Sequence, residues 1–197
     1  MERQKQFQTV VLLSIFLLFG GYANAQQTWE IPITKYGNGQ AKIVVIKTGK
    51  KMKRAQQIGT KMYYETGQMQ REVMPDNNGK YVEKYYYPNG QLAKIRPSDS
   101  PLGGLSKGEC KSYYSNGQLW QVGIFSFSYS TKEDYKEYYS TGILKATGKT
   151  VGFGKAVGVW TFYNEDGEVA KTEDFGEGRK LTRTGIDEEN KKYDLLD

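Results

Sequence analysis

The chain contains no histidine, and Cys110 is its single cysteine. The lack of histidine excludes Ser-His-Asp and Cys-His nucleophile systems and histidine-based zinc sites. One cysteine forms neither a thiolate metal cluster nor an internal disulfide. We interpret Cys110 as a free buried thiol, and an intermolecular bridge is the alternative that stays open.

Motifs for phosphate, calcium or glycoside chemistry are also missing. No Gly-x-x-x-x-Gly-Lys-Ser/Thr sequence occurs, and the glycines recur at the spacing that turns require. Residues Asp76 to Gly79 resemble the start of a calcium loop, but the later ligands and the closing carboxylate are absent, which favours an ordinary turn. No pair of carboxylates is marked out for glycoside hydrolysis. We therefore expect a protein that is not an enzyme and that holds no metal or cofactor.

Apolar residues are scarce, at 38% of the chain, whereas tyrosine occurs 16 times. After residue 25, no stretch keeps the 3.6-residue periodicity of an amphipathic helix. A two-layer sandwich would need more Leu, Ile and Val, but a thin sheet can be built from tyrosine, whose ring packs while its hydroxyl stays in water. The composition therefore predicts an all-β protein with a single-layer or lightly covered sheet.

Long hydrophobic runs are limited to Val10–Phe19, which follows a short basic region. The small residues Ala23 and Ala25 match the A-x-A pattern of a signal-peptide cleavage site, and the run is shorter than the roughly 20 residues that a membrane span needs. We predict that residues 1–25 are a cleaved signal peptide, with a buried core helix as the alternative. The mature chain would then be exported to the periplasm, the cell surface or the medium, without a transmembrane segment.

A short phrase recurs through the rest of the chain. Two aromatic residues, which favour strands, precede a turn that ends in glycine, and an apolar residue follows two positions after the glycine. Asn-Gly and related pairs provide the positive φ of tight hairpin turns. The clearest copies are Tyr63–Met69, Tyr86–Leu92, Tyr113–Leu119 and Tyr138–Leu144, with less regular copies at Tyr36–Ala41 and Phe162–Val169. Each copy predicts one β-hairpin.

The six turn glycines stand at a nearly constant spacing. They are Gly39, Gly67, Gly90, Gly117, Gly142 and Gly167, and subtraction of successive numbers gives steps of 28, 23, 27, 25 and 25. A period in this range is typical of repeat arrays, in which each unit buries its apolar surface on its neighbours. We predict an elongated array of about six β-hairpin repeats that forms one continuous antiparallel sheet over residues 26–184, followed by a charged, flexible tail at residues 185–197.

The pattern aromatic-Tyr-x-x-Gly-x-Leu, together with Gly-x-Trp-x-Phe-Tyr at Gly158–Tyr163, resembles the MORN-repeat variant family. The resemblance covers about residues 35–176. The sequence departs from the pattern at Gly39, which lacks the second aromatic residue before it, and at Gly167, which follows Tyr163 by four residues rather than three. The resemblance implies a MORN-like array that serves as a scaffold or binding surface, and some bacterial members of this family are described as antitoxin-like.

Five tyrosines occupy corresponding places in successive copies of the phrase. They are Tyr64, Tyr87, Tyr114, Tyr139 and Tyr163. If the repeats stack regularly, these rings form a ladder along one face. Two interpretations stay open: the ladder belongs to the core, or it is an exposed aromatic strip that recognises sugar rings or a partner protein. Because tyrosine is doubled in each copy, strand alternation places one ring on each face.

The chain carries a formal net charge of +6, and a basic cluster follows the β-rich segment Ala41–Lys47. The cluster comprises Lys47, Lys50, Lys51, Lys53 and Arg54. One interpretation is a solvated hairpin loop, and the other is a site for an anionic glycan or a phospholipid headgroup. Nucleic acid is not expected, because the chain is predicted to be exported.

Further along, residues 96–107 are rich in Pro, Gly and Ser and predict an exposed, protease-sensitive connection.

These features favour an exported, non-catalytic repeat protein that binds another macromolecule, most simply a protein, through its sheet surface. One alternative is an antitoxin-like or immunity-like inhibitor of a partner protein, as the resemblance implies. Such an exported inhibitor requires a target outside the cytoplasm. The other alternative is an envelope binder of glycan or anionic lipid that combines the tyrosines with the basic cluster.

Overall fold

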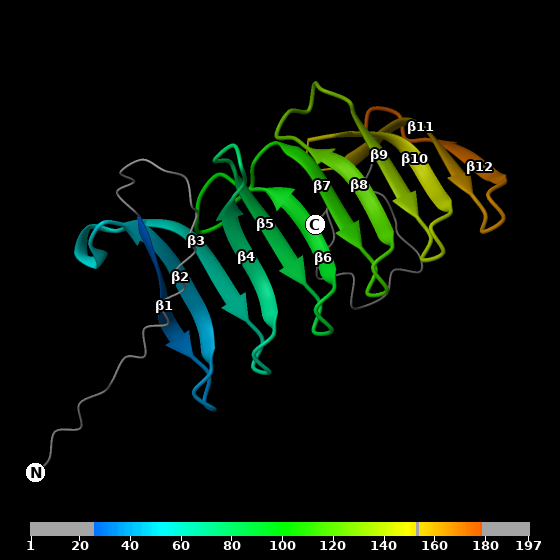
Figure 1. Cartoon of the computed structure of the whole chain (residues 1–197). Coiled ribbons are helices and arrows are strands. Elements are labelled where there is room, and N and C mark those ends of the chain that lie inside the picture. Colours follow the sequence, from blue (N-terminus) through cyan, green and yellow to red (C-terminus); the bar gives the residue numbers. More distant parts are fainter. Residues whose placement is uncertain (1–25, 153, 179–197) are drawn as a thin grey trace, which may run out of the picture.

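The computed structural model describes residues 26–152 and 154–178, which form one antiparallel sheet of twelve strands (Figure 1). The order of the strands across the sheet is their order in the sequence. They are β1 (Gln27–Lys35), β2 (Ala41–Gly49), β3 (Gln56–Tyr63), β4 (Met69–Pro75), β5 (Tyr81–Tyr86), β6 (Leu92–Pro97), β7 (Gly108–Tyr113), β8 (Leu119–Phe125), β9 (Glu133–Tyr138), β10 (Leu144–Val151), β11 (Lys155–Tyr163) and β12 (Val169–Asp174). A 3-10 turn, η1 (Met52–Arg54), is the one helical segment in this part of the chain.

The expectation of an all-β array of six hairpins in one continuous antiparallel sheet is confirmed. All six glycine turns lie along the same edge of the sheet, which is the lower edge in Figure 1 and which we call the repeat edge. The predicted signal peptide, the predicted tail and residues 179–184 of the predicted repeat domain lie outside the described residues. In the part of the chain that the structure describes, no helix has the length and apolar character of a membrane span.

The two faces of the sheet differ in burial. Successive side chains of a strand point to opposite faces, and residues paired directly across a ladder share a face. By this rule Val73, Glu83 and Gln121 lie on one face, which we call the ladder face, and all three are 0% exposed. Lys61 and Lys84 lie on the opposite, outer face, where the Lys84 side chain is 40% exposed. The core of the middle repeats therefore lies on the ladder face, whereas in the first repeats the buried Val44 and Ile46 of β2 lie on the outer face.

One part of this core is an aromatic cluster near the C-terminal end of the sheet. Trp160 is fully buried, with its ring centroid 5.3 Å from that of Tyr135 and 5.8 Å from that of Phe175. Its indole N–H donates a hydrogen bond to the backbone oxygen of Lys149. Gly148 is required beside this ring, because a Cβ atom there would lie 2.3 Å from the indole. A chain poor in aliphatic residues thus builds its core from a few large aromatic rings.

A second part of the core is ionic. The buried carboxylate of Glu83 accepts hydrogen bonds from Arg71, from Arg96 at 2.7 Å and from the Tyr85 hydroxyl at 2.7 Å. Burial alone would raise the pKa of the Glu83 carboxyl, but the hydrogen bonds from Arg96 and Tyr85 and the two arginine charges hold that pKa below its ordinary value. Glu83 is therefore buried as an anion with two cationic partners.

The connection between β6 and β7 covers this ionic centre. Its backbone oxygens accept hydrogen bonds from the sheet, Pro101 from the Thr60 hydroxyl at 2.8 Å and Leu102 from the Arg71 guanidinium at 3.0 Å. Residues 96–107 were predicted to be an exposed connection. The first two belong to β6 instead, and Ser98 is buried, because the connection folds back onto the ladder face.

Candidate binding surface

The six glycine turns share one backbone geometry. In the turn of β5 and β6, the Tyr87 N–H donates to the Gln91 oxygen and the Gly90 N–H donates to the Tyr87 oxygen, both at 2.9 Å. The same pair of bonds occurs in all six turns. The glycines at the fourth position have φ values between 83° and 88°, which favour glycine, and they are Gly39, Gly67, Gly90, Gly117, Gly142 and Gly167. The turn around Asp76 at the opposite edge is also closed in this way, with its glycine at φ 78°.

A tyrosine at the first turn position ties each hairpin to the next. Its hydroxyl donates a hydrogen bond to the backbone oxygen of the residue just before the following turn. The bonds run from Tyr36 to Tyr63, Tyr64 to Tyr86, Tyr114 to Tyr138 and Tyr139 to Tyr163 at 2.8 Å, and from Tyr87 to Tyr113 at 2.7 Å. These five hydroxyls make a ladder that spans all six hairpins.

The ladder rings are packed against the sheet by a residue six positions later. A β-bulge follows each turn and adds this residue to the second strand on the ladder face. The ring centroid of Trp120 lies 6.1 Å from that of Tyr114, and the Lys145 Nζ atom lies 5.7 Å from the centroid of the Tyr139 ring. Burial raises the pKa of Tyr114 to about 12. Tyr87 is 1% exposed.

Four of the five tyrosines predicted as a binding strip, at positions 64, 87, 114 and 139, therefore have their hydroxyls engaged inside the array. The fifth, Tyr163, belongs to a different set, because Asn164 takes the first turn position in the last hairpin. Tyr36 is a ladder member that the sequence analysis missed. The available signal was its position three residues before Gly39, the same offset as in the other ladder members.

In the last five hairpins, the residue just before the turn is a tyrosine that lies on the outer face, where it pairs in register with an aliphatic residue of the same hairpin. The pairs are Tyr63–Met69, Tyr86–Leu92, Tyr113–Leu119, Tyr138–Leu144 and Tyr163–Val169. We call this row the tyrosine–aliphatic stripe. Its members are half-buried except for Val169, which is 60% exposed. The stripe crosses the outer face from β3 to β12 beside the repeat edge.

Charged residues of the outer face are mostly paired with each other. Lys61 lies 2.6 Å from Glu30, Lys84 lies 3.3 Å from Glu72, and Lys149 lies 2.6 Å from Asp134. The Tyr86 hydroxyl donates to Glu72 at 2.6 Å, and burial together with this acceptor raises the pKa of Tyr86. These ion pairs place charges of both signs beside the apolar rings of this face.

The basic residues Lys50, Lys51, Lys53 and Arg54 lie at the far edge, in the connection of β2 and β3 that includes η1. All four are exposed, and no ion pair to any of them is found among residues 26–152 and 154–178. Lys47 lies apart from them in β2, paired in register with Trp29. The structure thus keeps the four cations together but separates them from the stripe by the length of a strand.

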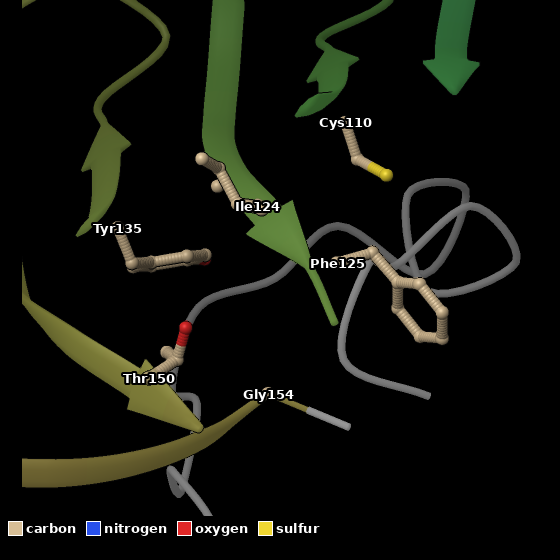
Figure 2. Close-up of a pocket in the computed structure, with 7 residues that line it drawn as sticks. Cys110, Ile124, Phe125, Tyr135, Thr150 and Gly154 are labelled. Carbon is tan, nitrogen blue, oxygen red and sulfur yellow. The ribbon is translucent and has the colours of Figure 1, made fainter. Parts of the chain in front are cut away.

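A small cavity lies on the ladder face beside Cys110 (Figure 2). Figure 2 shows Cys110, Tyr135 and Thr150 approaching it from β7, β9 and β10. Its volume of about 20 Å³ holds roughly one water molecule, so it is not a site for an organic ligand. Burial raises the pKa of the Cys110 thiol, which lowers the fraction present as thiolate. Within the described ranges, no group of acidic residues and cysteine is arranged to hold a metal ion.

Comparison with protein-family models matches three segments of the chain to the family described as MORN repeat variant, at residues 60–74, 82–98 and 107–126. A comparison with curated proteins found no match. The three matched segments coincide with the hairpins β3–β4, β5–β6 and β7–β8, each with its glycine turn at the repeat edge. The three hairpins between residues 60 and 126 are therefore recognised as MORN repeat variants.

Proposed function

We propose that this chain is an exported, non-catalytic repeat protein that binds another protein through the outer face of its sheet. The observation that carries the proposal is the tyrosine–aliphatic stripe, which repeats with every hairpin from β3 to β12. MORN repeats often serve as binding or scaffold modules. The predicted signal peptide supports export, and the absence of histidine from the sequence supports a role without catalysis.

The chemistry of the stripe suits a protein partner. Tyrosine rings with aliphatic neighbours supply rigid amphipathic contact area, which is enriched at protein interfaces. Ion pairs such as Lys61–Glu30 and Lys84–Glu72 border the stripe and would form a polar rim. Because the stripe repeats along the array, its natural partner is an extended segment that contacts several hairpins.

The test is a quantitative pull-down from an envelope fraction with three forms of the protein as bait. The stripe variant combines Tyr113→Ser with Leu119→Ser in the middle of the row, and the control is Lys136→Ser, which changes an exposed residue of the same face. We expect the wild type and the control to enrich the same protein and the stripe variant to lose it at least about tenfold. Equal capture by all three baits would overturn the assignment of binding to this face.

A second candidate function follows from the basic cluster. Lys50, Lys51, Lys53 and Arg54 are exposed cations without an ion pair among the described residues, and such a group attracts anionic lipid or glycan. Binding to phosphatidylglycerol vesicles that is lost when the four residues are changed to Glu would support it. Binding that survives the charge reversal would exclude it.

The antitoxin-like alternative is one form of the protein-binding proposal and needs a partner whose activity the protein blocks.

A further inference from the structure

The outer face contains a hollow of about 310 Å³ at the first two hairpins. Its lining includes Glu30 and Pro32 of β1, Ala41 and Val44 of β2, and Tyr63 of β3. Pockets for small organic groups begin at about this volume and combine an apolar lining with a few polar atoms. The hollow is therefore large enough for a single compact ligand ring.

The hollow exists because the first repeat departs from the stripe. Where the later hairpins pair a tyrosine with Met, Leu or Val, the first hairpin pairs Lys35 with Ala41. The methyl group of Ala41 fills far less space than a leucine side chain. The row of rings and aliphatic side chains consequently stops at Tyr63, whose ring forms one wall of the empty space.

The lining offers an apolar floor with hydrogen-bonding groups at its rim. Val44 is 4% exposed and pairs in register with the exposed Pro32, and the half-buried Ala41 completes the apolar lining. The Glu30 carboxylate is 43% exposed and forms a 2.6 Å ion pair with Lys61. Gln40 adds an exposed amide, which both donates and accepts hydrogen bonds.

The charges around the hollow favour a neutral ligand. Glu30 is already paired with Lys61, so a cationic group would have to displace an internal partner. Lys35 pairs in register with Ala41, but its side chain is exposed and it is not one of the residues that line the hollow. A ligand with one apolar side and several hydroxyl groups would pack on the Tyr63 ring and use the carboxylate and amide as acceptors and donors.

We infer that this hollow is a binding site for a neutral saccharide ring. The ring stacks its C–H face on Tyr63, and its hydroxyl groups hydrogen-bond with Glu30 and Gln40. The inference goes beyond the proposed function, since it involves the first repeat and needs no protein bound along the stripe from Tyr86 to Val169. A polysaccharide of the cell envelope offers many such rings at high local concentration. One weak site would therefore be enough to hold the repeat array at its surface.

The test is a titration of the full isotope-labelled protein with trisaccharides, followed by amide chemical shifts in NMR spectra. The probes are the trimers of glucose and of N-acetylglucosamine, with the trimer of galacturonic acid as the charged comparison. We expect shifts confined to residues 30–67 for a neutral trimer and weaker shifts for the charged one. No shift with either neutral trimer, or preference for the charged trimer, would overturn the inference.

The variant that separates this site from the stripe is at Ala41, which lines the hollow but is not a stripe residue, whereas Tyr63 belongs to both. Ala41→Leu restores the residue type of the later repeats and fills the hollow, so it should weaken saccharide binding at least about tenfold while the spectrum stays that of a folded sheet. Tyr63→Leu keeps the apolar bulk but removes the ring face and should have a similar effect. Leu144→Ala, in the stripe far from the hollow, should leave saccharide binding unchanged. Unchanged binding by Ala41→Leu would overturn the site even if the stripe variants lose a protein partner.

Discussion

The hydroxyl of Tyr87 donates a 2.7 Å hydrogen bond to the backbone oxygen of Tyr113. This bond crosses the junction of β6 and β7, where direct strand pairing is limited to Lys94–Ser112 and Ile95–Lys111. The Asn89 side chain crosses the same junction to the Ser115 oxygen at 3.0 Å. At this point the hairpins are therefore joined by turn side chains as well as by the sheet ladder.

Replacement of Tyr87 by Phe should lower the free energy of unfolding by about 1–2 kcal/mol. The ring stays, but the Tyr113 carbonyl loses its donor, and an unpaired half-buried acceptor costs about this much. Urea unfolding monitored by circular dichroism measures the change. Tyr113→Phe is the matched control, since no hydrogen bond to its hydroxyl is found in the described part of the chain, and it should change stability by less than about 0.5 kcal/mol. Equal effects would show that the ladder bond does not stabilise the array.

Gly117→Ala should destabilise the protein by about 1–2 kcal/mol, because φ at this position is 88° and a side chain is strained there. Gly37→Ala serves as the comparison in the first turn. Gly37 is absent from the positive-φ glycines, and an added Cβ atom would have no neighbour within 4 Å. Its replacement should be neutral or stabilise by up to about 1 kcal/mol. Thermal unfolding of both variants decides the point, and a loss of stability in Gly37→Ala would contradict the shared turn geometry.

Glu83→Gln should lower the free energy of unfolding by about 3 kcal/mol at neutral pH, since it leaves the largely buried Arg71 and Arg96 without their anion. The pKa of Glu83 is held below its ordinary value in the folded protein. Its stabilisation is therefore fully present above the unfolded value of about 4.3 and is lost as the pH falls through the folded value.

The measurement for this centre is urea unfolding of both forms from neutral to acidic pH. The difference between wild type and Glu83→Gln should be constant above about pH 5 and should shrink in more acidic solution. A difference that grows as the pH falls would mean that the folded state raises the pKa of this carboxyl, contrary to the two arginine contacts.

The Cys110 thiol should react slowly with alkylating reagents in the native protein. It is 3% exposed, and its burial raises the pKa so that less thiolate is present at any given pH. Reaction followed by mass spectrometry should be at least about a hundredfold faster in urea than in buffer. Rapid native alkylation would instead favour the intermolecular-bridge interpretation of this cysteine.

The hairpins and their turns could be predicted from the sequence because each turn needs a glycine at a fixed place after an aromatic pair. The sequence could not show which of the two adjacent tyrosines in each copy forms the ladder and which lies on the outer face. Alternation places Tyr86 and Tyr87 on opposite faces, but only the β-bulge at Ala93 and the reach of the Tyr87 hydroxyl to Tyr113 show which ring is structural. The ionic centre at Glu83 was also missed, since its partners Arg71 and Arg96 come from two neighbouring strands whose register the sequence does not state.

The division of the tyrosines between the two faces is the central claim, and chemical modification of phenol rings tests it most directly. The native protein would be treated with a tyrosine-nitrating reagent, and the extent of modification at each residue would be mapped by mass spectrometry. We expect Tyr113, Tyr138 and Tyr163 of the stripe to be modified well before the ladder residues Tyr64, Tyr87, Tyr114 and Tyr139. Modification of the ladder residues first, or of both sets at equal rates, would contradict it.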